Sequence, residues 1–355
     1  DRILLADGTL EFKVNKIIDT EIECTVVYGG ILSNHKGINL PGVKVSVPSL
    51  TKKDKADAKL ALDLGVDFLA LSFVRSASDI QDLKKLINAH SGNALIIAKI
   101  EKPEALDNAD EILEAADGIM VARGDLGVEL NPEQVPVAQH QLIDLARKKF
   151  KPVIVATQML ESMIENARPT RAEVTDVAYA VTLGTDAIML SGETAVGAFP
   201  VDAVKMMDRI ARQTESYLWT NNAYGSKVRY DSSKAAIPIW DAIANSMSQL
   251  AHDLRVRAVV VISKSGMSAA TMSSARPAAP VIAITKTMDV CQKILMHWGI
   301  VPVLSNDIEE TNFSDLARNI VVEKKLALKG QKVLLVQGFQ SDDALNKPSV
   351  TVLTI

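Results

Sequence analysis

The stretch Ala94-Leu-Ile-Ile-Ala-Lys-Ile-Glu-Lys-Pro-Glu-Ala-Leu106 decides the fold class of this 355-residue chain. It opens with five apolar residues, which predict a short strand buried on both faces. Lys99 and Glu101 follow with one residue between them, so their side chains leave the strand end on the same side. Because a lone buried charge is costly, two interpretations stay open: an ion pair, or a metal-binding carboxylate beside a phosphate-binding lysine.

From about residue 45, apolar strand-like runs alternate with amphipathic helical segments. The expected strands are 66–71, 94–98 with its Lys99/Glu101 end, 118–122, 153–156 and 186–190, and one helix is expected over 103–116. Polar residues stand where they end: Ser72, Lys99 and Glu101, Asp125, Thr157, and Ser191 with Glu193. Such residues after every strand are typical of a TIM-barrel rim, whereas a doubly wound sheet collects its site at one switch point. The sequence therefore favours a barrel.

The barrel is expected to be partial. We count roughly five βα units, and a closed (β/α)8 barrel has eight. Because an unclosed barrel would expose long sheet edges, we expect the missing strands upstream of Asp1. The predicted fold class is α/β, with the last five βα units of a TIM (β/α)8 barrel.

Two further regions flank these units. Residues 1–44 alternate like β strands, with a turn signal at Asp7-Gly8. Residues 219–230 are polar and aromatic, as in a linker. After them, a smaller α/β unit is expected, with strands at 258–262, 281–284, 301–304, 332–336 and 350–353.

Composition excludes several classes of protein. The formal net charge is -4, which gives no basis for binding nucleic acid or an anionic membrane. No apolar run is long enough to span a bilayer. Cys24 and Cys291 lack metal or redox spacing and are expected to be reduced thiols of a cytoplasmic protein.

The strand ends together suggest phosphoryl or enolate chemistry. Glu101 and Asp125 are two carboxylates on neighbouring strand ends, a usual arrangement for Mg²⁺. Lys99 would then stabilise charge on a transferring phosphoryl group or an enolate. The strand at 118–122 is expected to run into flexible backbone at 123–127, where Gly124 and Asp125 could bind a carboxylate, and Thr157 could hydrogen-bond the substrate. For each residue alone, a purely structural role is as reasonable as a functional one. Arg123 could form a salt bridge, Asp125 could cap a helix, and Thr157 could be an ordinary hydroxyl at a strand end.

The motifs resemble those of the pyruvate kinases over essentially the whole chain. Residues 94–106 are similar to the active-site signature of that family. The other similar stretches, in the family's order, are 32–41, Met120-Val-Ala-Arg-Gly-Asp-Leu-Gly-Val-Glu129, Ala156-Thr-Gln-Met-Leu-Glu-Ser-Met163, 169–177 and Met189-Leu-Ser-Gly-Glu-Thr-Ala195.

The resemblance implies a role for each matched residue. Lys99 stabilises the phosphoryl group in flight, and Glu101 and Asp125 hold Mg²⁺ or Mn²⁺. Gly124, Asp125 and Thr157 bind phosphoenolpyruvate or pyruvate. Lys36 contacts the phosphates of ADP or ATP, and the supporting residues beside the site are Ser72, Arg123, Ser191 and Glu193. K⁺ is also implied, although its ligands are not expected in this chain.

The resemblance also implies three domains and a homotetramer. The expected domains are a remnant of the β lid at 1–44, the C-terminal part of the barrel at 45–225, and an α/β allosteric domain at 226–355. The loop Ser263, Lys264, Ser265, Gly266, Ser268 is similar to a phosphate loop for an effector. Because the tail at 337–343 lacks the Trp/Arg/Gly-rich loop of members activated by fructose 1,6-bisphosphate, a sugar monophosphate or AMP is the expected effector. A plain strand-to-helix turn is the alternative.

The implied reaction is the last step of glycolysis, phosphoryl transfer from phosphoenolpyruvate to ADP. The first three barrel strands and half of the lid are expected to be missing, so residues 1–355 alone should be inactive or badly impaired. One alternative is a Mg²⁺-dependent lyase acting on a pyruvate enolate. Another is a non-catalytic remnant that binds partners or an effector.

Overall fold

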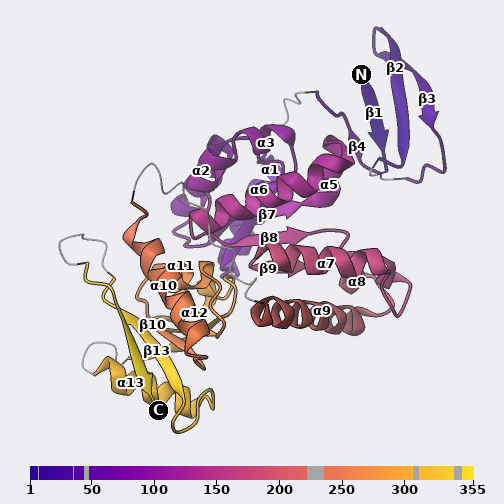
Figure 1. Ribbon diagram of the computed structural model, residues 1–355. Helices are drawn as coiled ribbons and strands as arrows, with labels where there is room; N and C mark the ends of the chain where they lie inside the picture. Colours follow the sequence, from indigo (N-terminus) through magenta and orange to yellow (C-terminus); the bar gives the residue numbers. More distant parts are fainter. Residues whose placement is uncertain (7, 35, 44–47, 222–235, 307–311, 340–345) are drawn as a thin grey trace. The chain divides into compact units, whose positions relative to one another are not determined.

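The computed structural model describes residues 1–355 except 7, 35, 44–47, 222–235, 307–311 and 340–345. Part of the predicted turn at Asp7, most of the predicted linker and the end of the 337–343 tail therefore lie outside the described residues. Three sheets make up the described strands (Figure 1). No helix among the described residues is long and apolar enough to cross a membrane.

The N-terminal sheet is antiparallel and has the order β3-β2-β1-β4. Its strands are β1 (Arg2–Leu5), β2 (Leu10–Ile18), β3 (Glu21–Tyr28) and β4 (Ile38–Asn39). β4 pairs with β1, so the segment that leaves β3 returns to the opposite edge of the sheet. This agrees with the strand alternation predicted for residues 1–44.

The second sheet has the order β5-β6-β7-β8-β9, which is also the order of its strands in the sequence. They are β5 (Phe68–Leu71), β6 (Leu95–Ile100), β7 (Gly118–Ala122), β8 (Val153–Ala156) and β9 (Ala187–Met189). β6 is parallel to both β5 and β7. Ile96 and Ala98 on one face are fully buried and Ile97 on the other is 2% exposed, which confirms the predicted burial of this strand on both faces.

Helices join these strands, as the alternating pattern predicts. They are α1 (Lys52–Asp63), α2 (Ala77–Ala89), α3 (Pro103–Asp107), α4 (Ala109–Ala115), α5 (Arg123–Glu129), α6 (Val135–Lys148), α7 (Arg171–Leu183), α8 (Gly192–Ala195) and α9 (Pro200–Thr220), with 3₁₀ turns at Pro132–Gln134 and Glu161–Ile164. The single helix expected over 103–116 is interrupted. Asn108 leaves helical geometry there, and its side chain donates to the Arg75 carbonyl at 2.8 Å.

The third sheet has the order β12-β11-β10-β13-β14. Its elements are α10 (Ile239–Asp253), β10 (Val259–Ile262), α11 (Met267–Ser274), β11 (Val281–Thr285), α12 (Met288–Ile294), β12 (Ile300–Leu304), α13 (Phe313–Glu323), β13 (Lys332–Gln337) and β14 (Ser349–Thr354). Apolar clusters cover both of its faces. The expected strands are present, but α13 has no counterpart in the sequence prediction, and β14 runs antiparallel to β13.

The chain divides into two compact units. The first comprises Asp1–Ile143, Ile154–Glu173 and Met189–Val204, and the second comprises Asp144–Val153, Val174–Ile188 and Lys205–Ile355. All the predicted strand-end residues lie in the first unit, and residues 263–268 lie in the second.

Candidate active site

Lys99 and Glu101 lie together at the C-terminal end of β6. Glu101 is 1% exposed and forms an ion pair with Lys99. Lys99 Nζ also donates to Ser72 Oγ at 2.8 Å, and the Phe73 backbone N–H donates to Glu101 Oε2 at 2.9 Å. The ion pair expected as one interpretation is therefore present. Because a carboxylate has about four acceptor positions, this pairing leaves room for a metal as well.

Gly124 and Thr157 meet at the ends of β7 and β8. The Gly124 N–H donates to Thr157 Oγ1 at 2.7 Å, and that hydroxyl donates to the Ala156 carbonyl at 2.6 Å. A Cβ at position 124 would lie 3.3 Å from Thr157 Oγ1, tighter than most such contacts. Glycine thus permits this close approach.

Residues 123–127 begin helix α5, although the sequence predicts flexible backbone there. The prediction was wrong because glycines at 124 and 127 suggest a loop when burial is unknown. Leu126 is fully buried, and packing outweighs the low helix propensity of glycine. Arg123, on the same turn, donates to the Thr157 carbonyl at 2.7 Å.

The backbone at Thr157 is strained. Its φ is 71° and that of Gln158 is 53°, so both occupy the left-handed region. A β-branched residue there is an outlier that costs on the order of 1–3 kcal/mol. Strain of this kind is found at functional sites more often than elsewhere.

Glu193 organises the end of β9. It is 2% exposed, and its two carboxylate oxygens accept the backbone N–H groups of Leu160 at 3.0 Å and Ser191 at 2.8 Å. Both bonds hold the loops after β8 and β9 in place. Glu193 therefore fixes the backbone of both loops.

The residues present fit a divalent cation. Glu101 is buried with its carboxylate at the rim, and Asp125 is exposed in the first turn of α5. Carboxylate oxygens suit Mg²⁺ and Mn²⁺, which commonly take one or two of them and complete their shell with substrate oxygens and water. Among the described residues, no cluster of three or more His, Cys, Asp or Glu could hold a metal. A site here would depend on these two carboxylates and on substrate.

The comparisons with known proteins agree with this geometry. The pyruvate kinase barrel-domain family matches residues 1–204, and the pyruvate kinase alpha/beta-domain family matches residues 241–349. The chain belongs to the pyruvate kinase family. Its fold is accordingly the pyruvate kinase α/β fold, with a parallel sheet and a separate C-terminal α/β domain.

Individual relatives of the pyruvate kinase family are similar over almost the whole chain. Pyruvate kinase 2 of Synechocystis sp. is 44% identical over 340 residues, 95% of this chain and 56% of that protein. The pyruvate kinase of Geobacillus stearothermophilus is 44% identical over 341 residues, 95% of this chain and 57% of that protein. A crystal structure of a pyruvate kinase from Cryptosporidium parvum has a TM-score of 0.85 at 36% identity and covers 99% of this chain and 71% of that one. The chain thus spans little more than half the length of the first two relatives.

Lys36, the nucleotide contact that the pyruvate kinase resemblance implies, is exposed in the segment leading into β4. Among the described residues, no hydrogen bond or ion pair joins it to the strand-end residues. The structure therefore brings together Ser72, Lys99 and Glu101 and, separately, Arg123, Gly124 and Thr157, but it does not tie Lys36 to either group.

In the second unit, residues 263–266 connect β10 to α11, and Ser268 lies in the first turn of α11. Lys264 and Ser265 are exposed, whereas the Ser263 hydroxyl is buried and accepts the Ala269 N–H at 3.3 Å. Gly266 has a φ of 90°, and a Cβ there would lie 2.6 Å from the Ile294 side chain. The loop is thus a tight turn that only glycine fits at position 266, with a lysine on its exposed side.

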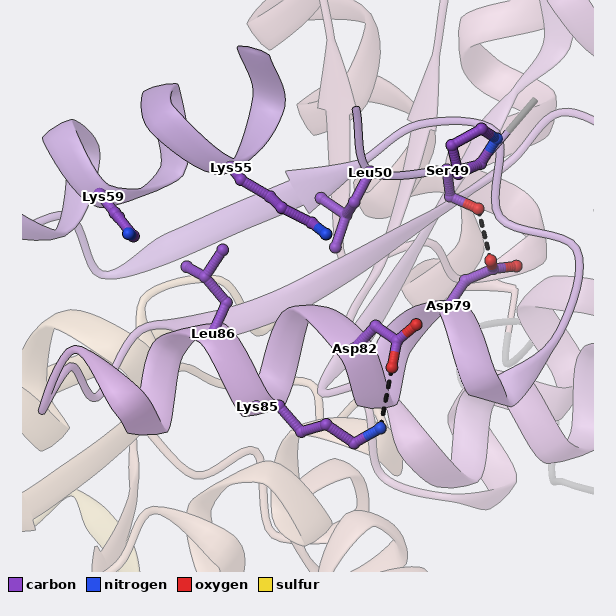
Figure 2. Close-up of a pocket in the computed structure, with 9 residues that line it drawn as sticks. Ser49, Leu50, Lys55, Lys59, Asp79, Asp82, Lys85 and Leu86 are labelled. Atoms are coloured by element: carbon purple, nitrogen blue, oxygen red, sulfur yellow. Dashed lines mark hydrogen bonds and ion pairs between the residues drawn. The ribbon is translucent and has the colours of Figure 1, made fainter. Parts of the chain in front are cut away.

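One cavity among the described residues lies away from the strand ends. It has a volume of about 510 Å³ and lies between α1, with Lys55 and Lys59, and α2, with Asp82 and Lys85 (Figure 2). Asp82 pairs with Lys85, and none of the strand-end residues lines it. A second cavity of about 430 Å³ is lined by Phe73, Lys102 and Glu129 and adjoins the Glu101 loop.

The sequence prediction missed three groups at the site. The Phe73 N–H holds Glu101, and Lys102 forms a partly buried ion pair with Glu129. A backbone donor carries no sequence signal. The Lys102–Glu129 pair had a weak one, since both residues stand inside the matched motifs, but their 27-residue separation hides the contact.

Proposed function

We propose that this chain carries the C-terminal part of a pyruvate kinase active site. The reaction transfers the phosphoryl group of phosphoenolpyruvate to ADP, giving ATP and pyruvate, the last step of glycolysis. The observation that carries the proposal is the group Ser72–Lys99–Glu101 on a buried strand end, together with the strained turn at Thr157 on another strand end of the same sheet.

Each residue has a task in the proposed reaction. The Lys99 ammonium group, held by Ser72 and Glu101, stabilises negative charge on the phosphoryl group during transfer and on the enolate that remains afterwards. Gly124, Asp125 and Thr157 hold the carboxylate end of the substrate, and Thr157 Oγ1 is a hydroxyl through which a proton can move. Glu101 and Asp125 would hold Mg²⁺ or Mn²⁺, which supplies charge neutralisation when bound.

Several finer features belong to the same proposal. Lys36 binds the nucleotide phosphates, and K⁺ takes part through ligands that we do not assign here. The loop 263–268 binds the phosphate of an effector, a sugar monophosphate or AMP. The whole protein is a cytoplasmic homotetramer, with a β lid remnant (1–44), barrel part (45–225) and allosteric α/β domain (226–355).

The parallel sheet supports the proposal of a partial barrel. β5 and β9 are its two edges in the described chain, and a closed (β/α)8 barrel needs eight strands. The site at the strand ends is then shared with βα units beyond these five. We therefore propose that residues 1–355 on their own turn over slowly or not at all, and normal turnover by this chain would contradict that part of the proposal.

The test is formation of pyruvate from phosphoenolpyruvate with and without ADP, using the whole protein and its Lys99→Met variant. We expect an ADP-dependent reaction that the substitution lowers by about 10²-fold or more, since Lys99 acts on charge that develops in the transition state. Arg318→Gln, which alters an exposed ion pair in the second unit, is the control and should keep full activity. ADP-independent cleavage of an aldol substrate would favour a lyase instead, and no turnover with either substrate would favour a binding role.

A further inference from the structure

Glu129 joins three segments of the first unit. It occupies the last position of α5, and its side chain is 3% exposed. It forms an ion pair with Lys102, whose side chain is 19% exposed and which follows Glu101 directly in the chain. Its Oε1 also accepts a hydrogen bond from Asn39 Nδ2 at 3.4 Å, from strand β4. One carboxylate at the end of helix α5 therefore contacts both the loop after β6 and the N-terminal sheet.

Helix α5 carries functional residues at one end and the contacts with the N-terminal sheet at the other. Gly124 and Asp125 lie in its first turn, and Val128 and Glu129 in its last. A Cβ at Gly8, in the turn between β1 and β2, would lie 3.8 Å from Val128. A helix of seven residues is about 10 Å long and behaves as one rigid piece. Displacement of β4 or of the β1–β2 turn would therefore act on Asp125.

The charges around Glu129 balance. The adjoining cavity of about 430 Å³ is lined by two cations, Arg75 and Lys102, and two carboxylates, Glu104 and Glu129. Removing the charge of Glu129 leaves a net positive charge beside Glu101 and a Lys102 ammonium with little access to water. Such a charge repels a divalent cation, and the repulsion is poorly screened in a partly buried site.

We infer that Glu129 is a positioning residue of the metal site: it neutralises Lys102 next to Glu101 and fastens the N-terminal sheet, through Asn39, to the helix that carries Asp125. The inference rests on the proposed function, because Glu101 and Asp125 must be the metal-binding carboxylates for it to hold.

The test measures Mn²⁺ binding to the 355-residue chain by electron paramagnetic resonance, without and with oxalate as a planar dianion in place of substrate. We expect Glu129→Gln to weaken Mn²⁺ binding about tenfold, the size expected for a unit charge acting on a divalent ion across roughly 10 Å of partly screened protein. Lys102→Met should tighten it, and the double variant should return close to the original affinity.

The opposite effects of Glu129→Gln and Lys102→Met on Mn²⁺ affinity distinguish this inference from a purely structural role of the ion pair. Both single variants break the same ion pair, so a structural role alone would weaken Mn²⁺ binding in both. Asp117→Asn is the matched control, because Asp117 accepts the Ile96 N–H near the other end of the same β6 strand. It should leave Mn²⁺ affinity unchanged. If Glu129→Gln does not fold, Lys102→Met alone still tests the inference: tighter Mn²⁺ binding supports it, and weaker binding contradicts it.

The link to the N-terminal sheet has its own readout. Asn39→Ala removes the contact with Glu129 without changing charge, so we expect Mn²⁺ affinity to stay within about twofold and hydrogen exchange to rise in peptides covering β4 and α5. Unchanged exchange in α5 would overturn that part of the inference. If the unaltered chain and the Glu101→Gln variant bind Mn²⁺ equally, both the proposed metal site and this inference are wrong. If Glu101→Gln abolishes Mn²⁺ binding but Glu129→Gln leaves Mn²⁺ affinity unchanged, the metal site stands and only the inference about Glu129 is wrong.

Discussion

At Thr157, hydrogen bonds hold a single residue in a backbone conformation that its side chain disfavours. Its left-handed backbone is unfavourable for a β-branched side chain, yet its hydroxyl accepts the Gly124 N–H and donates to the Ala156 carbonyl. The Arg123 side chain, bound to the Thr157 carbonyl, adds a further restraint. Three contacts thus hold one hydroxyl at the meeting point of two strand ends.

Substitutions at Thr157 should separate strain from hydrogen bonding. Thr157→Ser keeps the hydroxyl and removes the branch that disfavours positive φ, so we expect stability equal to or slightly above that of the original chain. Thr157→Ala loses both hydrogen bonds of the hydroxyl and should cost about 1–2 kcal/mol. Urea denaturation measures both. Equal destabilisation by the two substitutions would show that the methyl group, rather than the hydroxyl, holds the turn.

Helix α7 shows how a single carboxylate fixes an element. Glu173 accepts hydrogen bonds from the Ser162 N–H and hydroxyl at 2.7 and 2.6 Å, and from the Thr170 N–H and hydroxyl at 2.7 and 2.9 Å. It therefore caps α7 and ties it to the 3₁₀ turn after β8. Burial alone would raise the pKa of Glu173, but these hydrogen bonds outweigh burial and hold the pKa below its ordinary value of 4.5.

This capping predicts a pH dependence. Because the folded-state pKa of Glu173 is below the unfolded value, its contribution to stability is present above pH 4.5 and is lost as the pH falls through the folded pKa. Glu173→Gln should therefore be less stable at pH 7, and the gap to the original chain should narrow on acidification below pH 4.5. Thermal unfolding between pH 7 and pH 3 measures the gap. Glu165→Gln, at an exposed position nearby, is the control; a gap that stays constant with pH would contradict the prediction.

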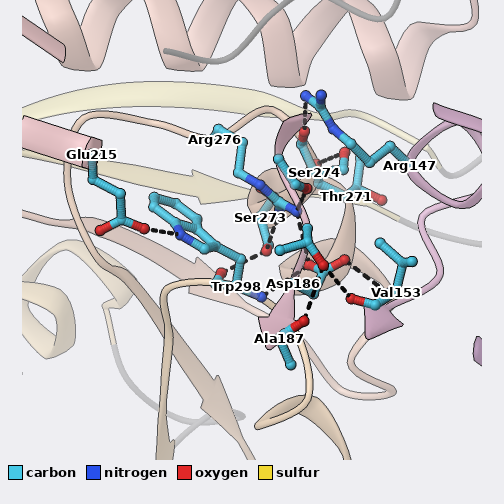
Figure 3. A network of polar contacts seen from close by, with 12 residues as sticks. Arg147, Val153, Asp186, Ala187, Glu215, Thr271, Ser273, Ser274, Arg276 and Trp298 are labelled. Carbon is cyan, nitrogen blue, oxygen red and sulfur yellow. Dashed lines mark hydrogen bonds and ion pairs between the residues drawn. The ribbon is translucent and has the colours of Figure 1, made fainter. Parts of the chain in front are cut away.

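At the scale of the whole molecule, one polar network joins distant segments of the second unit (Figure 3). Arg276 and Asp186 form an ion pair of 3.1 Å with side chains 2% and 4% exposed. Arg276 also donates to the Gly184 carbonyl and lies over the Trp298 ring, 5.3 Å from its centroid. Trp298 in turn donates its backbone N–H to Asp186 and its ring N–H to Glu215. The segment before β9 is thereby bound to the turn after α11 and to the loop before β12, and Trp298 of that loop binds α9.

Breaking this network should cost more than breaking a surface pair. Arg276→Gln leaves Asp186 buried without its cation, so we expect a loss of about 3–5 kcal/mol. Arg318→Gln alters an exposed pair with Asp315 and should change stability by less than about 1 kcal/mol. Tryptophan fluorescence during denaturation follows the second unit, because Trp298 lies in the network. Equal effects of the two substitutions would show that the buried pair contributes no more than a surface one.

Much of the fold could be predicted because its signals are local. The apolar run before Lys99 predicted a doubly buried strand, and five such runs predicted the five strands of one sheet. Three features could not be predicted from the sequence, for the same physical reason. The helix at 123–129, the break at Asn108 and the whole of α13 depend on packing or on long-range hydrogen bonds, which override the propensities that sequence displays.

The sequence by itself determined which residue types stand at the strand ends, since strand periodicity and motif order are properties of neighbours along the chain. Only the tertiary structure decided how they are held: that Glu101 is paired with Lys99 and the Phe73 N–H, that Gly124 touches Thr157, and that Glu129 joins Lys102 to Asn39. These contacts span up to 90 residues of chain. Long-range contacts form when burial brings strands and helices together, and no local pattern encodes their partners.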